Sequence, residues 1–165
     1  MITLISGGVK SGKSGRALDI ARGDFPPPVS FIATAEGMDE EMRDRIRRHQ
    51  AERAGGFFIT IEEPLDLDRA VAGAGPSVVV DCVSLWINNL IYHKREEDFP
   101  GILEAFIRRI PRNCVIVTNE TGLGNIPFDE NTRRYNLLLA EANRKIAAAA
   151  DTLEFMVAGI PLRVK

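Results

Sequence analysis

The sequence predicts an α/β protein built on a mostly parallel, doubly wound sheet. Apolar, strand-like runs alternate with helix-forming segments along almost the whole chain, which is the order that a parallel sheet requires. The runs at 77–83 (SVVVDCV) and 114–118 (CVIVT) are almost continuously apolar, as expected of strands covered on both faces. Because no repeat, low-complexity tract or linker interrupts the pattern, we expect residues 1–165 to form a single nucleotide-binding domain around the motif described next.

The first turn of the chain carries a phosphate-binding motif. Residues 7–14 read GGVKSGKS, the G-x-x-x-x-G-K-S pattern of a P-loop, between an apolar strand at 1–6 and a helix at 13–22. Glycines allow backbone N–H groups to converge on a phosphate, and the helix start adds partial positive charge. Lys13 would reach the β- and γ-phosphates and the Ser14 hydroxyl would ligate Mg²⁺. The motif predicts binding of a nucleoside triphosphate.

The remaining elements follow from apolar runs and from the residues that break them. Strands are expected at 29–35, 57–61, 77–83, 114–118 and 152–158, and helices at 39–53, 67–72, 85–93, 102–109 and 131–150. Prolines end the first helix near residue 23 and separate the helices at 85–93 and 102–109, and Gly55-Gly56 ends the helix at 39–53. We expect 119–129 to be a functional loop and 159–165 to be a tail.

Composition limits the class of protein. A hydrophobic share of 45% and a charged share of 27% are those of an ordinary globular protein, and a net charge of −2 argues against a nucleic-acid partner. No apolar run has the length of a membrane span, and the N-terminal residues already have strand character, so a cytoplasmic protein is expected. Cys82 and Cys114 are expected to be core residues rather than a disulfide or metal pair.

Ligands of such sheets collect at the carboxyl ends of the strands, and several polar residues are predicted there. Asp81 ends its strand as either a magnesium-associated carboxylate or the N-cap of the next helix. Glu120 could orient an attacking hydroxyl or hold Mg²⁺, or could cap a turn, and the sequence does not separate these roles. Trp86, Asn88 and Asn89 either line a second-substrate site or, in the case of the tryptophan, pack in the core.

His49 is the candidate nucleophile. On a helix it shares one face with Arg45 and Arg53, and Ile46 places it beside the apolar stripe. Nearby arginines attract phosphate and disfavour the protonated imidazole, and a neutral imidazole beside a triphosphate can attack phosphorus. The alternative is a solvated helix on which the histidine is idle. His93, in the charged stretch HKREED, is expected to be a surface residue.

Together these segments resemble the bifunctional cobinamide kinase/cobinamide-phosphate guanylyltransferase family of adenosylcobalamin (vitamin B12) synthesis. The resemblance covers nearly the whole chain and includes GGVKSGKS, FIATAEGMDEEMRDRIRRHQAER, the Glu62-Glu63-Pro64 corner, VVDCVSLWINNL, VTNETGLGNIP and VAGIPLRVK. The helix pattern R-I-x-x-H-x-x-x-R and the segment D-C-x-x-L-W-x-N-N are more specific than the P-loop, which many families share.

The resemblance implies a RecA-like P-loop NTPase fold, a homotrimer and two reactions. A γ-phosphoryl passes from ATP or GTP to adenosylcobinamide; separately, a histidine takes GMP from GTP, releasing pyrophosphate, and passes it to adenosylcobinamide phosphate to give adenosyl-GDP-cobinamide. The resemblance implies that His49 is the catalytic histidine. Lys13 and Glu120 are the other candidate catalytic residues, and Ser14 and Asp81 the candidate Mg²⁺ ligands, for the reasons given above. The implied nucleotide contacts are Gly7, Gly8, Val9, Lys10, Ser11, Gly12, Lys13, Ser14, Thr34, Ala35, Glu36, Gln50, Ala51, Glu52, Arg53, Glu62 and Asp81.

Two other functions stay open on the residues alone. One is a P-loop kinase for another small alcohol or nucleotide, with His49 idle. The other is a RecA-like switch module that hydrolyses nucleotide to change partners, for which a basic groove or a disordered tail would be expected, and the sequence has neither.

Overall fold

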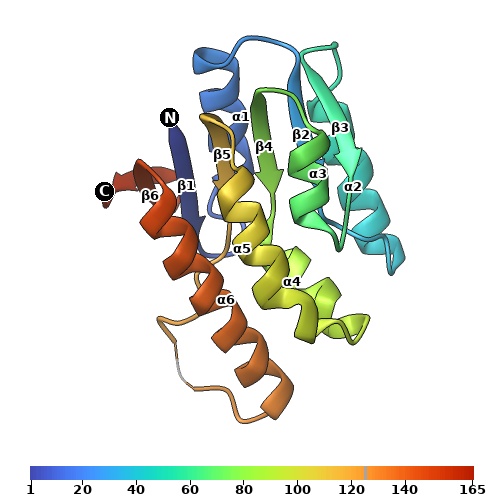
Figure 1. Ribbon diagram of the computed structural model, residues 1–165, viewed down its shortest axis with the longest axis vertical. Helices are drawn as coiled ribbons and strands as arrows, with labels where there is room; N and C mark the ends of the chain where they lie inside the picture. Colours follow the sequence, from blue (N-terminus) through green and yellow to red (C-terminus); the bar gives the residue numbers. More distant parts are fainter. Residues whose placement is uncertain (125) are drawn as a thin grey trace.

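The structure, a computed structural model, describes residues 1–124 and 126–165, apart from the side chain of Arg45. Within this part the strands form a seven-stranded sheet of order β3-β2-β4-β5-β1-β6-β7 (Figure 1). Strands β1 to β6 pair in parallel, and β7 runs antiparallel to β6. The strands are β1 Ile2–Gly7, β2 Val29–Ala33, β3 Phe58–Glu62, β4 Ser77–Asp81, β5 Asn113–Val117, β6 Thr152–Val157 and β7 Ile160–Arg163.

Helices cover both faces of the sheet, so each central strand contributes to two cores. Val78 and Val80 of β4 pack in the core that α3 to α6 cover, whereas Val79 packs in the core that α1 covers. This two-sided burial explains the apolar run predicted for β4. No helix of the described residues is long and apolar enough to cross a membrane. The helices are α1 Lys13–Asp24, α2 Glu40–Glu52, α3 Leu67–Gly73, α4 Val83–Tyr92, the 3₁₀ turn η1 Glu96–Asp98, α5 Phe99–Arg109 and α6 Glu130–Ala149.

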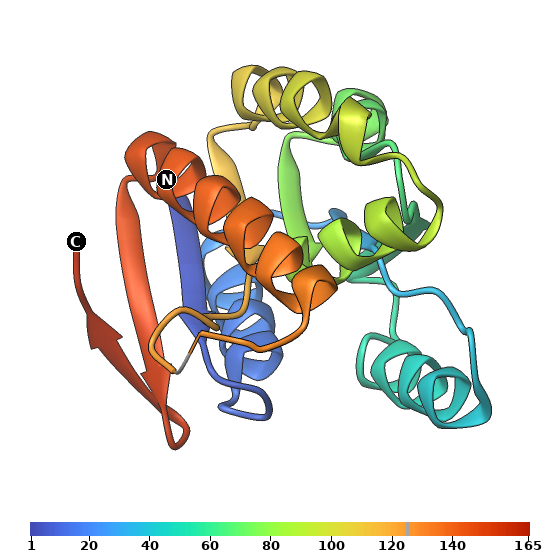
Figure 2. The same ribbon diagram turned by 90° about the horizontal axis from the view of Figure 1, so that it is seen from below.

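Helix α2 differs from the others because none of its described residues belongs to either core. Figure 2 shows it set apart from the helices that cover the sheet. Its start is fixed locally, since the Asp39 carboxylate accepts a hydrogen bond from Met42 N at 2.7 Å. The helix therefore owes its position to polar contacts and to the few apolar residues on its inner side.

Several element boundaries differ from the prediction by one to three residues, and two of the differences have a clear physical cause. Strand β4 ends at Asp81 rather than residue 83, because Cys82 N donates to Thr34 Oγ1 at 2.9 Å and Cys82 becomes the N-cap of α4. Pro100 does not separate two helices but lies in the first turn of α5, where a missing N–H costs no helical hydrogen bond.

The prediction that 159–165 is a tail is wrong, because Ile160–Arg163 forms β7. Ala158 and Gly159 have φ values of 51° and 85°, as in the two-residue hairpin turns that match the twist of a sheet. Pro161 fits this strand because β7 lies at the sheet edge, where one N–H needs no partner. The edge strand leaves Ile160 and Leu162 largely exposed.

Candidate active site

The P-loop, residues 7–14, joins β1 to α1 in a conformation that depends on glycine. Gly12 is the N-cap of α1 with φ of 93°, in the left-handed region that suits glycine. A Cβ atom on Gly7 would lie 2.6 Å from Met156 O, so only glycine fits there without a shift of the neighbouring strand β6. The loop is thus packed closely against the start of the β6–β7 hairpin, where Gly159 N donates to Ser11 O at 3.2 Å.

Three side chains predicted to handle phosphate and metal meet at this loop. The buried Lys13 ammonium donates to Gly8 O at 2.5 Å and so remains within the loop. Ser14 Oγ donates to Asp81 Oδ1 at 3.3 Å, which brings together the two predicted Mg²⁺ ligands from the ends of α1 and β4. Among the described residues no group of three or more His, Cys, Asp or Glu side chains could hold a metal. A hydroxyl with one carboxylate suits Mg²⁺, which takes its other ligands from phosphate and water.

A cavity of about 690 Å³ opens over the P-loop. Its floor is formed by residues 9–15 of the P-loop and α1, and Asp81 and Asn119 line it from the ends of β4 and β5. Helix α2 contributes Arg48 and His49 to the opposite wall. Lysine, arginine and backbone N–H donors around one cavity are suited to an anionic ligand such as a polyphosphate.

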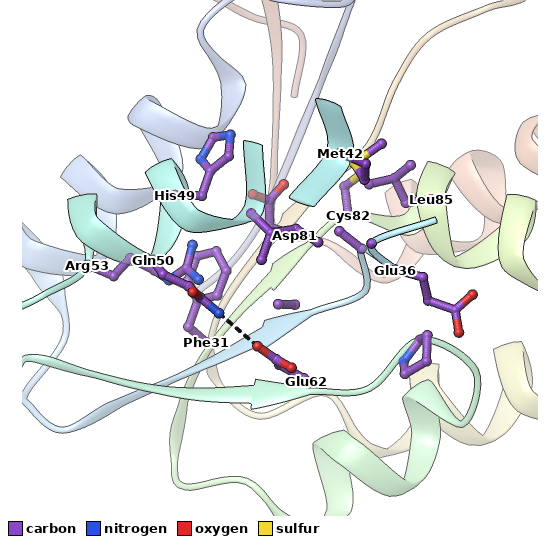
Figure 3. Close-up of a pocket in the computed structure, with 15 residues that line it drawn as sticks. Phe31, Glu36, Met42, His49, Gln50, Arg53, Glu62, Asp81, Cys82 and Leu85 are labelled. Atoms are coloured by element: carbon purple, nitrogen blue, oxygen red, sulfur yellow. Dashed lines mark hydrogen bonds between the residues drawn. The ribbon is translucent and has the colours of Figure 1, made fainter. Parts of the chain in front are cut away.

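A second cavity, of about 480 Å³, lies between α2 and the ends of β2, β3 and β4 (Figure 3). Arg53 is only 6% exposed, and its guanidinium carbon lies 3.9 Å from the centre of the Phe31 ring. Its Nε has no hydrogen-bond partner among the described residues, and burial lowers the pKa of Arg53 against the raising effect of Asp81, Glu52 and Glu62. A buried donor of this kind at a cavity wall is suited to a polar ligand.

The same cavity contains a polar pair that joins α2 to the sheet. Gln50 Nε2 donates to Glu62 Oε1 at 2.8 Å (Figure 3). Met42, Ile46 and Leu85 supply apolar lining. An apolar pocket of this volume with a few oriented polar groups is the usual form of a small-molecule site.

His49 lies where the two cavities meet. It lines both of them, together with Asp81, Cys82 and Leu85. In Figure 3 its ring points away from Gln50 and Arg53, which lie on the other side of α2. His49 Nδ1 lies 3.2 Å from Glu52 Oε2. The two cavities are therefore adjacent, and we refer to them together as the groove.

Comparison with known proteins identifies the family. A family model described as cobinamide kinase / cobinamide phosphate guanyltransferase matches residues 3–164. The chain belongs to this family. The bifunctional adenosylcobalamin biosynthesis protein CobP of Pseudomonas aeruginosa is 39% identical over 171 residues, which cover 100% of this chain and 98% of that protein. The bifunctional adenosylcobalamin biosynthesis protein CobU of Salmonella typhimurium is 32% identical over 184 residues, which cover 100% of both.

A solved structure supports the fold of this family member. The flagellar accessory protein FlaH from Methanocaldococcus jannaschii matches with a TM-score of 0.54 over 99% of this chain and 77% of that chain. At 13% sequence identity the likeness shows the fold alone. With the strand order, it confirms the predicted RecA-like P-loop NTPase fold.

The groove brings together most of the residues predicted for this family's site, but not all of them. Thr34 is completely buried and lines neither cavity, although its neighbours Ala35 and Glu36 line the second one. Ala51 is exposed on α2 and lines neither cavity. Glu120 also lines neither cavity. Its carboxylate accepts a hydrogen bond from Gly122 N at 2.5 Å, and its backbone N–H donates to Gly7 O at 3.1 Å.

Other predictions concern residues near the groove. The side chain of Arg45 and residue Asn125 of the loop 119–129 lie outside the described residues. Cys82 and Cys114 are both buried, as predicted for core residues. Trp86 and Asn89 are both buried and line neither cavity, whereas Asn88 is exposed.

The sequence did not single out several residues of the groove. Phe31 lines it, and so do Arg22 and Arg48; Asn119, at the carboxyl end of its strand as the sequence indicates, lines it too. Phe31 looked like an ordinary strand residue, and only the approach of Arg53 from α2 makes it part of the site. Asn119 could have been weighted more heavily, because it directly follows a buried strand at the binding edge of the sheet.

Proposed function

We propose that the single groove between the P-loop and α2 serves both reactions of this cobinamide kinase and cobinamide phosphate guanylyltransferase of cobalamin biosynthesis. The observation that carries the proposal is that His49 lines both cavities. A triphosphate held by the P-loop with its base in the second cavity would extend past His49, because the two cavities meet there. The imidazole would then lie near the α-phosphate, which joins the base-bearing ribose to the rest of the triphosphate.

In the kinase reaction, the P-loop amides and Lys13 would hold the triphosphate of ATP or GTP. The aminopropanol hydroxyl of adenosylcobinamide attacks the γ-phosphorus, the bond to the β–γ bridging oxygen breaks, and nucleoside diphosphate leaves. Ser14 and Asp81 would hold Mg²⁺, which neutralises phosphate charge when bound. Glu120, beside the P-loop through its bond to Gly7, is proposed to accept the hydroxyl proton.

In the transferase reaction, His49 Nε2 is the proposed nucleophile. It attacks the α-phosphorus of GTP, the bond to the bridging oxygen breaks, and pyrophosphate leaves, so that GMP is held on nitrogen. A phosphate oxygen of adenosylcobinamide phosphate then attacks the same phosphorus and releases the histidine. Glu52 supports this role, because a carboxylate on Nδ1 favours the tautomer with a lone pair on Nε2 and stabilises positive charge on the ring.

The second cavity is the proposed site of the guanine base. Glu62 offers a carboxylate to the N1–H and N2–H₂ donors of guanine, and adenine has no such pair of donors on that edge. Arg53 offers donors to the O6 and N7 acceptors, the pairing that arginine makes with guanine in nucleic acids. The remaining proposed contacts are Ala35, Glu36 and Gln50 in this cavity, Glu52 beside His49, and Thr34 and Ala51 as backbone neighbours.

The test is protein labelling with [α-³²P]GTP. The wild-type protein is expected to retain label through denaturation and lose it in acid, since the bond from histidine nitrogen to phosphorus is acid-labile. His49→Ala should take no label and should keep kinase activity, with Arg47→Ala, at an exposed position on the same helix, as a labelled control. A wild-type protein that never takes label would contradict the transferase proposal and favour a simple kinase or a nucleotide-dependent switch.

We also propose that residues 1–165 form one domain and that the protein is a cytoplasmic homotrimer that binds no nucleic acid. Support for self-association comes from the exposed apolar side chains of the edge strand β7, such as Ile160 and Leu162, because edge strands readily pair. The net charge of −2 supports the absence of a nucleic-acid partner. Light scattering after size exclusion measures the oligomeric state directly; a monomeric mass at micromolar concentration would contradict the trimer.

A further inference from the structure

One face of helix α4 carries three polar side-chain groups that reach away from their own helix. Trp86, Asn89 and His93 are spaced by three and four residues and therefore lie along one side of α4 and its C-cap. Helix α4 follows β4, but each of these side chains contacts a loop that follows β2 or β3. These residues belong to the D-C-x-x-L-W-x-N-N segment and its continuation, and the reactions proposed above use none of the three.

Asn89 joins two of those loops. Its side chain is only 3% exposed, and its Nδ2 donates to Thr34 O at 2.7 Å and to Pro64 O at 3.1 Å. Thr34 follows β2 and Pro64 follows β3, so one amide group links the ends of two neighbouring strands. An asparagine NH₂ group has two N–H donors, and both are used.

The flanking residues hold the same two loops. Trp86 Nε1 donates to Leu65 O at 2.7 Å, while its ring stacks on Phe99. His93 Nε2 lies 2.9 Å from Glu36 Oε2. The loop after β3 is also ordered from within, because Glu63 Oε1 accepts from the backbone N–H of Leu65 and Asp66.

These loops form one wall of the second cavity. Ala35 and Glu36, just after Thr34, line it, and so do Glu62 and Pro64. Asn89 itself does not line the cavity, and its two acceptors belong to the wall or to the residue beside it. The amide therefore stands behind the wall that the base would contact.

We propose that Asn89 is a positioning residue for base selection: it sets the separation of the loops after β2 and β3, and with it the position of Glu62 relative to Ala35 and Glu36. The inference rests on the proposed placement of guanine in the second cavity. The ladder holds Glu62 opposite Ala33 and ends one residue later, where Glu63 N donates to Ala33 O at 3.0 Å. Asn89 bonds to the loops past that point, and a shift of about 1 Å between them and Glu62 would prevent one base from matching both walls.

The substitution Asn89→Leu tests this, because leucine has nearly the same shape and offers no donor. Both carbonyl oxygens would lose a partner, and the loops would shift to reach water or other donors. The fold is expected to survive, since Thr34 Oγ1 still bonds to the backbone of Cys82 on both sides, at 2.8 and 2.9 Å. Asn88→Leu is the matched control, because the neighbouring Asn88 is exposed on the same helix.

The assay is formation of labelled protein from α-³²P GTP and from α-³²P ITP, which lacks the 2-amino donor. We expect Asn89→Leu to raise the half-saturating GTP concentration roughly 10- to 100-fold and to bring the GTP-to-ITP preference close to 1. The maximal labelled fraction should stay near that of the wild type. Asn88→Leu should match the wild type in all three quantities.

The outcomes separate the two proposals. If the wild type takes no label from GTP, the transferase function itself is wrong. If the wild type labels and Asn89→Leu loses labelled fraction with an unchanged GTP-to-ITP preference, Asn89 is merely structural and the positioning role is refuted. Should Asn89→Leu fail to fold, Trp86→Phe keeps the ring stack and removes the Leu65 bond; it should reduce the same preference, and an unchanged preference there would also refute the role.

Discussion

Replacing Arg53 by methionine should weaken nucleotide binding without weakening the fold. Arg53 is buried against Phe31, its Nε has no hydrogen-bond partner in the described part of the chain, and burial lowers its pKa. Exchanging a buried charge for an apolar side chain is often stabilising by about 1–4 kcal/mol. Against this stands the lost contact with the Phe31 ring, worth about 2 kcal/mol when desolvated. We therefore expect the free energy of unfolding of Arg53→Met to lie between about 1 kcal/mol below the wild-type value and about 2 kcal/mol above it.

The same substitution should weaken the binding of GTP. A hydrogen bond from a charged donor contributes about 1.5–3 kcal/mol, so the Kd for GTP should rise roughly 10- to 150-fold. Urea unfolding measures the free energy of unfolding, and titration calorimetry measures the Kd for GTP. The control is Arg47→Met, because Arg47 lies on the same helix, is exposed and pairs with Asp44; neither quantity should change by more than about 0.5 kcal/mol. A destabilised Arg53→Met protein that binds GTP normally would refute the reasoning, since it would make Arg53 a structural residue.

Three further predictions concern the P-loop and its supports. Gly7→Ala should lower the free energy of unfolding by at least about 2 kcal/mol, because its Cβ would meet Met156 O at 2.6 Å; Gly8→Ala, whose Cβ meets nothing within 4 Å, should be nearly neutral by thermal unfolding. Asp81→Asn should weaken GTP binding roughly 10- to 100-fold with Mg²⁺ present and little after EDTA, and equal Mg²⁺ dependence in both proteins would contradict the metal role. The hydrogen bond from Arg16 holds the pKa of Glu154 below its ordinary value, so this pair stabilises the fold above about pH 4.3 and loses its effect as pH falls through the lower folded-state pKa. Between about pH 6 and pH 3 the wild type should lose about 1 kcal/mol more stability than Glu154→Gln, after allowance for solvent screening; superimposable curves would contradict this.

The sequence predicted those parts of the site that are encoded locally. The P-loop needs only consecutive residues, because one strand, one glycine turn and one helix create its backbone donors. Asp81 was likewise placed by the end of an apolar strand, and the structure brings it to Ser14 as expected. The parallel sheet followed from the alternation of strands and helices.

What the sequence could not supply depends on contacts between distant segments. The pairing of Arg53 with Phe31 and the bonds from Asn89 to Thr34 and Pro64 require the packing of α2 and α4 against the strand ends. The edge strand β7 was missed for another reason. Its turn uses Ala158 at positive φ where asparagine or glycine would have signalled a hairpin, and Pro161 argued against a strand.

The position of α2 outside both cores explains how one groove could serve two reactions. Because none of the described residues of α2 belongs to either apolar core, the stability of the sheet depends little on how His49, the proposed nucleophile, is placed. Hydrogen bonds that hold α2 in place include the one from Gln50 to Glu62 and the one from Arg22 to Glu52 O, at 3.0 Å. Such contacts are each worth about 1 kcal/mol and can be exchanged for contacts with a ligand. Substitutions on the groove side of α2 should therefore change activity far more than stability, whereas the loops after β2 and β3, which are hydrogen-bonded to the buried side of α4, have no such freedom.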